Sequence, residues 1–245
     1  MFGIRSSPSF EVRHDDPTDV MICGFAEFGL AGLTAVDYLT KQLELEETGH
    51  ISVEQLPPIT PFENGTPRHH TRLFSKPEFE YTILVGELYV PPFATESFGD
   101  AVLEYTEKNP VEEVVVLSGV PFVHESIDHR PFFVASDDYQ REHDLSDHIE
   151  PMAGGFLDGI NGALMQRAVD SPLRTAVFTT PVHPRIPDVD AALRLINAVT
   201  NVYDLEVDIE PLESFAAEVS RHYEELAARV EEGRTEMAHD DRMYM

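Results

Sequence analysis

The chain has 245 residues, enough to bury a substantial core without disulfides or a structural metal. Its 17 Lys and Arg residues are set against 45 Asp and Glu residues, which gives a formal net charge of −28 at pH 7. This charge repels nucleic-acid phosphates and anionic membranes, so the expected partners include neither nucleic acid nor a membrane. The hydrophobic fraction of 42% exceeds that of a disordered acidic chain, and it predicts a folded protein.

The same composition favours an environment of multimolar salt. Arg replaces most Lys, Trp is absent, and at such salt the Debye length falls to roughly 3 Å, where dense surface charge repels itself only weakly. The start of the chain, Met1 to Arg5, lacks the apolar stretch of a signal peptide, and no apolar run is long enough to cross a bilayer. We therefore expect a halophilic, cytoplasmic protein.

Short apolar runs alternate with amphipathic segments along the chain. The runs are continuous, as in strands buried on both faces, and the segments carry apolar residues at intervals of three and four. In chain order we predict a strand over Val20–Phe25, a helix over Leu30–Leu43, strands over Ile51–Leu56 and Tyr81–Gly86, a helix over Thr95–Lys108, strands over Val114–Leu117 and Phe132–Ala135, a helix over Leu157–Ala168, a strand over Thr175–Thr179, and helices over Val189–Val199 and Ser214–Glu232. This order predicts an α/β fold with a mostly parallel central sheet flanked by helices.

Two stretches interrupt the pattern, at Pro57–Arg72 and Ser118–Pro151. Their prolines, histidines and aspartates predict long loops or small inserted elements. Gly233 is a natural stop after the last predicted helix. We therefore predict one α/β domain over residues 1–232 and a flexible C-terminal tail over residues 233–245.

The first glycine-rich segment runs from Gly24 to Gly32, after a strand and at the start of a helix. Its spacing differs from the dinucleotide fingerprint, no Gly-Lys-Ser/Thr follows, and Glu27 disfavours a phosphate in the turn. We interpret the segment as a tight turn with close helix packing rather than a nucleotide site. No cofactor is expected.

A second glycine-rich segment, Gly154–Leu164, places Gly155, Gly159 and Gly162 on one face of the predicted helix. Glycine inside a helix costs about 1 kcal/mol relative to alanine, so this face must allow a close approach by a strand, a helix or a ligand. Ligand pockets of α/β folds lie at strand ends, and the candidates to line such a pocket here are Gly24, Glu27, Asp158 and Asn161.

Cysteine and histidine give no reason to expect a metal or a nucleophile. Cys23, the single cysteine, lies in an apolar run and is expected to be a core residue. Ser118-Gly119 follows a strand but lacks the glycine spacing of a nucleophile elbow. The histidine-rich positions lack the spacing of a helical zinc site and are interpreted as solvated loop residues; they are His69, His70, His124, Asp128, His129, His143 and His148. Arg68 and Arg72 are likewise interpreted as loop charge.

The last three residues, Met243-Tyr244-Met245, resemble the hydrophobic-tyrosine-any signature with which activators dock between the α subunits of the 20S proteasome. A terminal arm can bring its carboxylate to a basic pocket, while the tyrosine ring supplies buried area and an orienting hydroxyl. The alternative is a solvated terminus with three accidental residues.

Further segments extend this resemblance. Gly24 to Leu39 looks like the opening of the archaeal proteasome assembly chaperone family, related to the eukaryotic PAC two protein. Gly154–Leu164, followed by Thr179-Thr180-Pro181 and Pro187 to Ala192, is similar to that family's second signature. The resemblance covers roughly residues 18–225. It implies a phosphorylase-like three-layer sandwich, self-association and a role with the 20S core, and it implies no catalytic residue.

Three functions follow as hypotheses. The first is a non-enzymatic, ATP-independent assembly chaperone or activator-like adaptor, anchored to 20S α subunits by Met243, Tyr244 and Met245 and working as a homo-oligomer. The second is a small-molecule-binding or hydrolytic enzyme that uses the strand-end pocket. The third is a binding module that recognises another protein through the proline-rich loop.

Overall fold

The computed structural model describes residues 8–77, 79–121, 129–145, 148–183 and 187–216. The chain divides into two compact units, residues 1–207 and 208–245. In the second unit, residues 210–216 are helical, and the rest of the predicted C-terminal helix lies outside the described residues. The predicted domain limit at residue 232 also lies there and stays a prediction.

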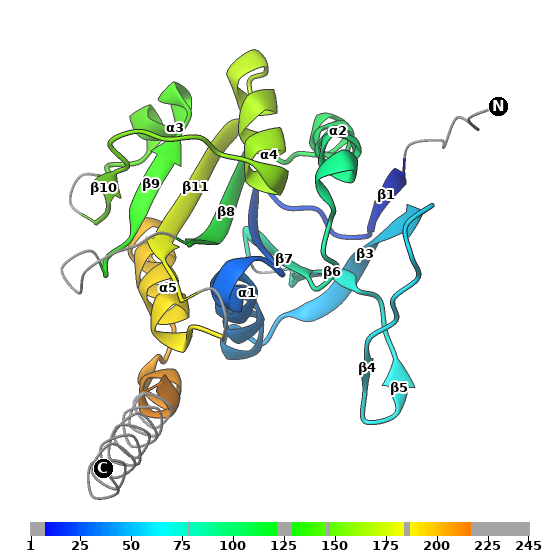
Figure 1. Cartoon of the computed structure of the whole chain (residues 1–245), viewed down its shortest axis with the longest axis horizontal. Coiled ribbons are helices and arrows are strands. Elements are labelled where there is room, and N and C mark those ends of the chain that lie inside the picture. Colours follow the sequence, from blue (N-terminus) through cyan, green and yellow to red (C-terminus); the bar gives the residue numbers. More distant parts are fainter. Residues whose placement is uncertain (1–7, 78, 122–128, 146–147, 184–186, 217–245) are drawn as a thin grey trace, which may run out of the picture. The chain divides into compact units, whose positions relative to one another are not determined.

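The first unit is built on a nine-stranded mixed sheet with the order β1-β3-β6-β7-β2-β8-β11-β9-β10 (Figure 1). Its centre is parallel: β2 pairs with β7 and β8, and β8 pairs with β11. A separate small hairpin joins β4 and β5. The strands are β1 (Ser9–His14), β2 (Val20–Phe25), β3 (Glu46–Glu54), β4 (Phe62–Glu63), β5 (Thr66–Pro67), β6 (Thr71–Ser75), β7 (Tyr81–Gly86), β8 (Glu113–Val120), β9 (Phe132–Ala135), β10 (Glu150–Pro151) and β11 (Arg174–Pro181).

Helices cover both faces of this sheet. The α-helices are α1 (Ala31–Gln42), α2 (Thr95–Lys108), α3 (Asp137–Glu142), α4 (Gly159–Asp170) and α5 (Val189–Tyr203), and short 3-10 turns, η1 (Phe28–Leu30) and η2 (Pro92–Ala94), precede α1 and α2. Helices α1 and α5 pack together on one face, and α2 and α4 pack together on the other (Figure 1). The predicted α/β fold with a helix-flanked, largely parallel central sheet is confirmed.

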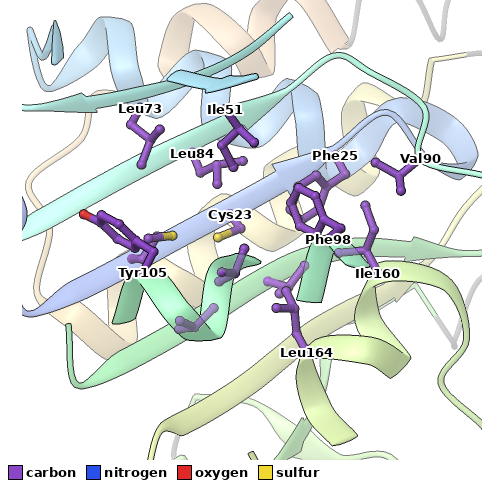
Figure 2. Packing of buried hydrophobic residues seen from close by; sticks show 14 of the residues in the cluster. Cys23, Phe25, Ile51, Leu73, Leu84, Val90, Phe98, Tyr105, Ile160 and Leu164 are labelled. Carbon is purple, nitrogen blue, oxygen red and sulfur yellow. The ribbon is translucent and has the colours of Figure 1, made fainter. Parts of the chain in front are cut away.

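The period of two along β2 divides its side chains between the two faces. Met21, Cys23 and Phe25 enter the cluster beneath α2 and α4, where Phe98 packs edge-on against Phe25 (Figure 2). Ile22, on the opposite face, is also fully buried. Because both faces of β2 are covered, its sequence is a continuous apolar run, and the strand was predicted from that run.

The predicted close packing after β2 is confirmed at two glycines. A Cβ on Gly32 would lie 1.9 Å from the Leu117 carbonyl oxygen, and one on Gly24 would lie 2.2 Å from the Gly32 carbonyl oxygen. Helix α1 can therefore approach β2 and β8 only because neither position carries a side chain.

The interpretation of the second glycine-rich segment is corrected. Helix α4 begins at Gly159, so Gly155 precedes it, and a Cβ on Gly155 would meet open space. A Cβ on Gly162 would lie 2.6 Å from the Leu157 carbonyl oxygen, which is in the loop before the helix. The contact between α2 and α4 is instead made at Gly99, which faces Ala163.

Most predicted elements are confirmed. Strands β2, β7 and β9 and helix α2 have the predicted limits, whereas β3 begins five residues before the predicted Ile51. Strands β1 and β6 were not predicted, whereas the short hairpin, α3 and β10 are small elements within the two stretches that were predicted to hold long loops or small inserted elements. No helix among the described residues is long and apolar enough to span a membrane.

Candidate functional site

A polar cluster lies where the central strands end. Because β2 and β8 are parallel, Glu27, just after β2, comes close to Ser118, near the end of β8. The Ser118 hydroxyl donates to Glu27 Oε2 at 2.9 Å. Asn161, in the first turn of α4, directs Nδ2 to Ser118 Oγ at 2.8 Å and to Glu27 Oε2 at 3.2 Å. Three segments far apart in sequence are thus tied together by three polar side chains.

The electrostatics of this cluster are only partly balanced. Burial raises the pKa of Glu27, against the hydrogen bonds from Ser118 and Asn161, and the charge of Asp158 raises it further. Asn161 Oδ1 is buried and has no hydrogen-bond partner among the described residues. The cluster therefore combines a carboxyl group whose ionisation is opposed by burial with an amide oxygen that no described residue hydrogen-bonds.

The structure brings only some of the four predicted pocket residues together. Glu27 and Asn161 are brought into contact, and Asp158 lies next to them but is exposed. Gly24 serves the packing of α1. Ser118, which completes the cluster, was not predicted as a site residue, although its place at a strand end beside Gly119 was a usable signal.

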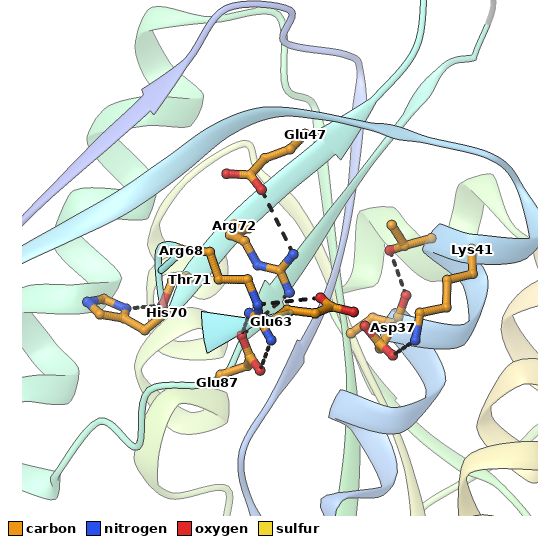
Figure 3. Close-up of polar contacts among 11 residues, drawn as sticks. Asp37, Lys41, Glu47, Glu63, Arg68, His70, Thr71, Arg72 and Glu87 are labelled. Carbon is orange, nitrogen blue, oxygen red and sulfur yellow. Dashed lines mark hydrogen bonds and ion pairs between the residues drawn. The ribbon is translucent and has the colours of Figure 1, made fainter. Parts of the chain in front are cut away.

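A cavity of about 610 Å³ is lined by residues of α1, β6, β7 and the β4–β5 hairpin, and Figure 3 shows the polar contacts among residues of this region. Arg68 Nη2 donates to Glu87 Oε1 at 2.9 Å, and Nη1 contacts the other oxygen of the same carboxylate. Arg72 Nη2 lies 3.5 Å from Glu87 Oε2. At the rim, Lys41 pairs with Asp37 at 2.6 Å.

This cavity corrects the interpretation of Arg72 as loop charge. The residue belongs to β6 and is 8% exposed, with its guanidinium 4.9 Å above the Phe74 ring. The hydrogen bond to Glu87 is the leading cause that raises the pKa of Arg68. Since Glu87 and three other acids line the cavity beside its cations, the site is not a free anion clamp.

Among the described residues, the histidines do not gather into a metal site. His50 and His69 stack with ring centroids 3.7 Å apart, and His70 Nδ1 lies 2.9 Å from the Thr71 hydroxyl. Across the described ranges, no group of three His, Cys, Asp or Glu side chains is arranged to hold a metal ion. His124 and Asp128 lie outside these ranges.

The opposite ends of the strands carry a second buried carboxylate. Glu113, at the start of β8, contacts the Tyr203 hydroxyl, His143 Nε2 at 2.9 Å and Arg174 Nε at 3.2 Å. Burial opposes its ionisation, but the hydrogen bonds from His143, Tyr203 and Arg174 hold the pKa of Glu113 below its ordinary value. The Tyr139 hydroxyl extends the network at 3.0 Å from that of Tyr203.

The predicted docking residues, Met243, Tyr244 and Met245, lie outside the described residues. Their role stays a prediction from the sequence.

Known proteins match nearly the whole chain. The model of the PAC2 family matches residues 21–227. An uncharacterized protein of Methanocaldococcus jannaschii is 24% identical over 218 residues, which cover 89% of this chain and 88% of that protein.

Two solved structures from Pyrococcus furiosus share the fold. PbaA, described as an archaeal homolog of proteasome-assembly chaperone, aligns with a TM-score of 0.81 and 21% identity over 97% of this chain and all (100%) of PbaA. PbaB, described as an archaeal proteasome activator, aligns with a TM-score of 0.74 and 18% identity over 89% of this chain and 99% of PbaB. At these identities the structures show a common architecture.

Proposed function

Since the chain belongs to the PAC2 family, we propose that it is a proteasome-binding assembly chaperone or activator-like adaptor that works without ATP. It docks its C-terminal tail, Met243-Tyr244-Met245, into pockets between the α subunits of the 20S proteasome. The observation that carries this proposal is the fold shared with PbaA and PbaB over most of all three chains.

Physical chemistry supports the tail as the anchor. Its terminal carboxylate suits a cationic pocket, and the Tyr244 ring adds apolar area and a hydroxyl. Ordering a terminal arm on binding costs entropy, so a single tail is expected to bind weakly. A homo-oligomer that presents several tails raises their effective concentration at the ring, and self-association is therefore part of the mechanism.

The polar cluster at the strand ends supports a role without catalysis. Ser118 is 2% exposed, and its hydroxyl is already committed to Glu27. Because this hydroxyl is buried and hydrogen-bonded to Glu27 and Asn161, we assign the cluster to holding β2, β8 and α4 together. The acidic composition supports work in a salt-rich cytoplasm.

Co-sedimentation with purified 20S particles in multimolar KCl tests the proposal. The full-length protein is expected to sediment with the particles, and a variant that ends at Arg242 is expected to stay in the supernatant. A matched control, Asp240→Asn with Asp241→Asn, changes the charge of the tail but keeps its last three residues, and it is expected to bind.

Far-UV circular dichroism of each variant verifies that the fold is intact. Equal sedimentation of the full-length and shortened proteins would remove the tail from the mechanism. Failure of the full-length protein to sediment would reject proteasome binding under these conditions.

A further inference from the structure

The cavity beside α1 contains two arginines that share one carboxylate. Arg68 and Arg72 both contact Glu87. The next nearest acids, Glu63 and Glu47, lie 3.8 and 3.9 Å from a guanidinium nitrogen, and their side chains are 70% and 41% exposed. Two guanidinium groups carry about ten N–H donors, whereas one carboxylate has about four acceptor sites. The cavity therefore holds more donors than the carboxylate shared by the arginines can accept.

Some of these donors have no acceptor. The Nε atoms of Arg68 and Arg72 are buried and have no hydrogen-bond partner among the described residues. The side chain of Arg72 is only 10% exposed, and its contacts with carboxylates are 3.5 and 3.9 Å long. Charge-assisted hydrogen bonds are normally about 2.7–2.9 Å long. A buried guanidinium with such long contacts lacks a close anionic partner.

The side of the cavity formed by α1 carries carboxylates. Asp37, Lys41 and Glu44 line it from α1 and the turn that follows, and Figure 3 shows Asp37 and Lys41 apart from the two arginines. Asp37 pairs with Lys41, but their side chains are 43% and 69% exposed, and such surface pairs contribute little. Glu44 makes no ion pair with any residue that the structure describes. This side therefore offers carboxylates to a ligand cation.

Apolar side chains complete the lining of the cavity, and they are Leu33, Leu45, Phe62, Phe74 and Val85. Phe74 and Val85 belong to the sheet and are buried, whereas Phe62, on the β4–β5 hairpin, is 73% exposed. Small-molecule sites have volumes of about 300–1,000 Å³ and combine an apolar lining with a few polar groups. The volume of about 610 Å³ and the mixed lining therefore suit a small ligand with an apolar body.

The charges of the lining restrict the class of ligand. Three cations and four acids give a formal net charge of −1, and these residues are Lys41, Arg68, Arg72, Asp37, Glu44, Glu63 and Glu87. A phosphate group would be repelled by these carboxylates, and the lining has no excess of cations to compensate. A simple cation would leave the guanidinium donors without an acceptor. A ligand that carries both a carboxylate and an ammonium satisfies both sides.

We propose that this cavity binds a short free peptide in its zwitterionic form. The peptide carboxylate accepts hydrogen bonds from Arg68 and Arg72. The peptide ammonium lies against Asp37 and Glu44, and an apolar side chain contacts Phe74. The inference goes beyond the proposed function and does not depend on tail docking, because none of these residues lies in the tail.

Equilibrium dialysis of the full-length protein in multimolar KCl tests this assignment. The probe is a pool of dipeptides with apolar side chains, and mass spectrometry measures the retention of each one. A control pool has the same sequences with acetylated amino ends and amidated carboxyl ends. Free dipeptides are expected to bind at least about tenfold more tightly than their blocked forms, because blocking removes the charge-assisted hydrogen bonds. Retention of no free dipeptide, or equal retention of the blocked forms, would overturn the proposal.

Substitutions on each side of the cavity locate the site. Arg68→Gln is expected to weaken retention at least about tenfold, and Glu44→Gln about threefold, as for an exposed charge pair. Arg130→Gln and Glu46→Gln are the matched controls and should bind like the wild type. Arg130 also pairs with a glutamate, at 2.6 Å, and Glu46 is exposed, but neither residue lines this cavity.

The variant Glu44→Gln keeps the test valid if Arg68→Gln does not fold, since Glu44 is exposed. Far-UV circular dichroism identifies the variants that retain the fold. Unchanged retention by the folded cavity variants, or an equal loss in the matched controls, would overturn the assignment of the peptide to this cavity.

Discussion

Each end of the central parallel strands carries a buried carboxylate, and the pKa values of these two carboxylates are shifted in opposite directions. At the amino ends, Glu113 has three partners, Tyr203, His143 and Arg174, and its pKa is lowered. At the carboxyl ends, Glu27 has only neutral donors, and burial raises its pKa. Large apolar side chains are exposed around the second end.

The difference indicates which end contributes more to the stability of the fold. A buried carboxylate that accepts hydrogen bonds from several donors holds together the elements that carry the carboxylate and the donors. At the other end, Asn161 Oδ1 has no hydrogen-bond partner among the described residues and large apolar side chains are exposed, so this end is held together less tightly. The comparison therefore predicts different consequences of mutation at the two ends.

The largest effect is expected from Glu113→Gln. The substitution removes the negative charge that contacts His143 and Arg174, on a side chain that is 2% exposed. Because the partners are then left without that charge in a buried site, the free energy of unfolding should fall by about 3 kcal/mol. Denaturant titration at constant high salt measures this loss. Because the pKa of Glu113 is lowered in the fold, its contribution is present above the unfolded-state pKa and is lost as pH falls through the folded-state pKa. The difference between wild type and variant should therefore shrink on acidification.

The adjacent Glu112 supplies the control for that prediction. It pairs with the same Arg174 at 3.1 Å, but its side chain is 66% exposed. Glu112→Gln should change stability by no more than about 0.5 kcal/mol. Equal effects at the two positions would contradict the buried network.

A smaller loss is expected from Ser118→Ala. The variant leaves Glu27 without one donor and Asn161 Nδ2 without one acceptor, which should cost about 1 to 2 kcal/mol in denaturant titration. Thr179, its partner across the β8–β11 pairing, has a buried hydroxyl with no hydrogen-bond partner among the described residues. Thr179→Val is therefore the matched control and should be neutral or stabilising. A neutral Ser118→Ala would show that the cluster does not tie these elements together.

The smallest effect, and one of opposite sign, is expected from Glu27→Gln. Since the pKa of Glu27 is raised in the fold, the stabilising contribution of this carboxyl is present below its unfolded-state pKa and is lost as pH rises through its folded-state pKa. At neutral pH the variant should match the wild type or exceed its stability by up to about 1 kcal/mol, and the gain should vanish toward acid pH. The free energies of unfolding of both proteins, measured across a range of pH, test this prediction. A variant that becomes less stable relative to the wild type as pH rises would contradict the raised pKa of Glu27.

The buried centre of the fold could be predicted from the sequence because both of its faces are apolar. Val20–Phe25 and Tyr81–Gly86 were predicted with the limits that β2 and β7 have. Strand β1 was missed because strands were predicted from continuous apolar runs, whereas its polar and apolar residues alternate, as in a half-buried strand at an edge of the sheet. Strand β6 was missed because Arg72 and the prolines before it resemble a loop.

The candidate site could be predicted only in part. Glu27 and Asn161 were predicted as site residues because each lies in a glycine-rich segment. Ser118, which hydrogen-bonds to both of them, lies in a third segment. Pairings across such distances depend on the order of strands in the sheet, which no local pattern contains. The network around Glu113 was missed for the same reason, since its members come from β8, β11 and the ends of α3 and α5.

The central claim, that the C-terminal tail anchors the protein to the proteasome, is tested most directly by one binding isotherm. Immobilised 20S particles in multimolar KCl are titrated with the wild-type protein and with Tyr244→Ala, which changes one ring and leaves residues 1–243 intact. The account predicts that the variant binds at least about thirty-fold more weakly, the effect of losing a central aromatic anchor. Superimposable isotherms would contradict it.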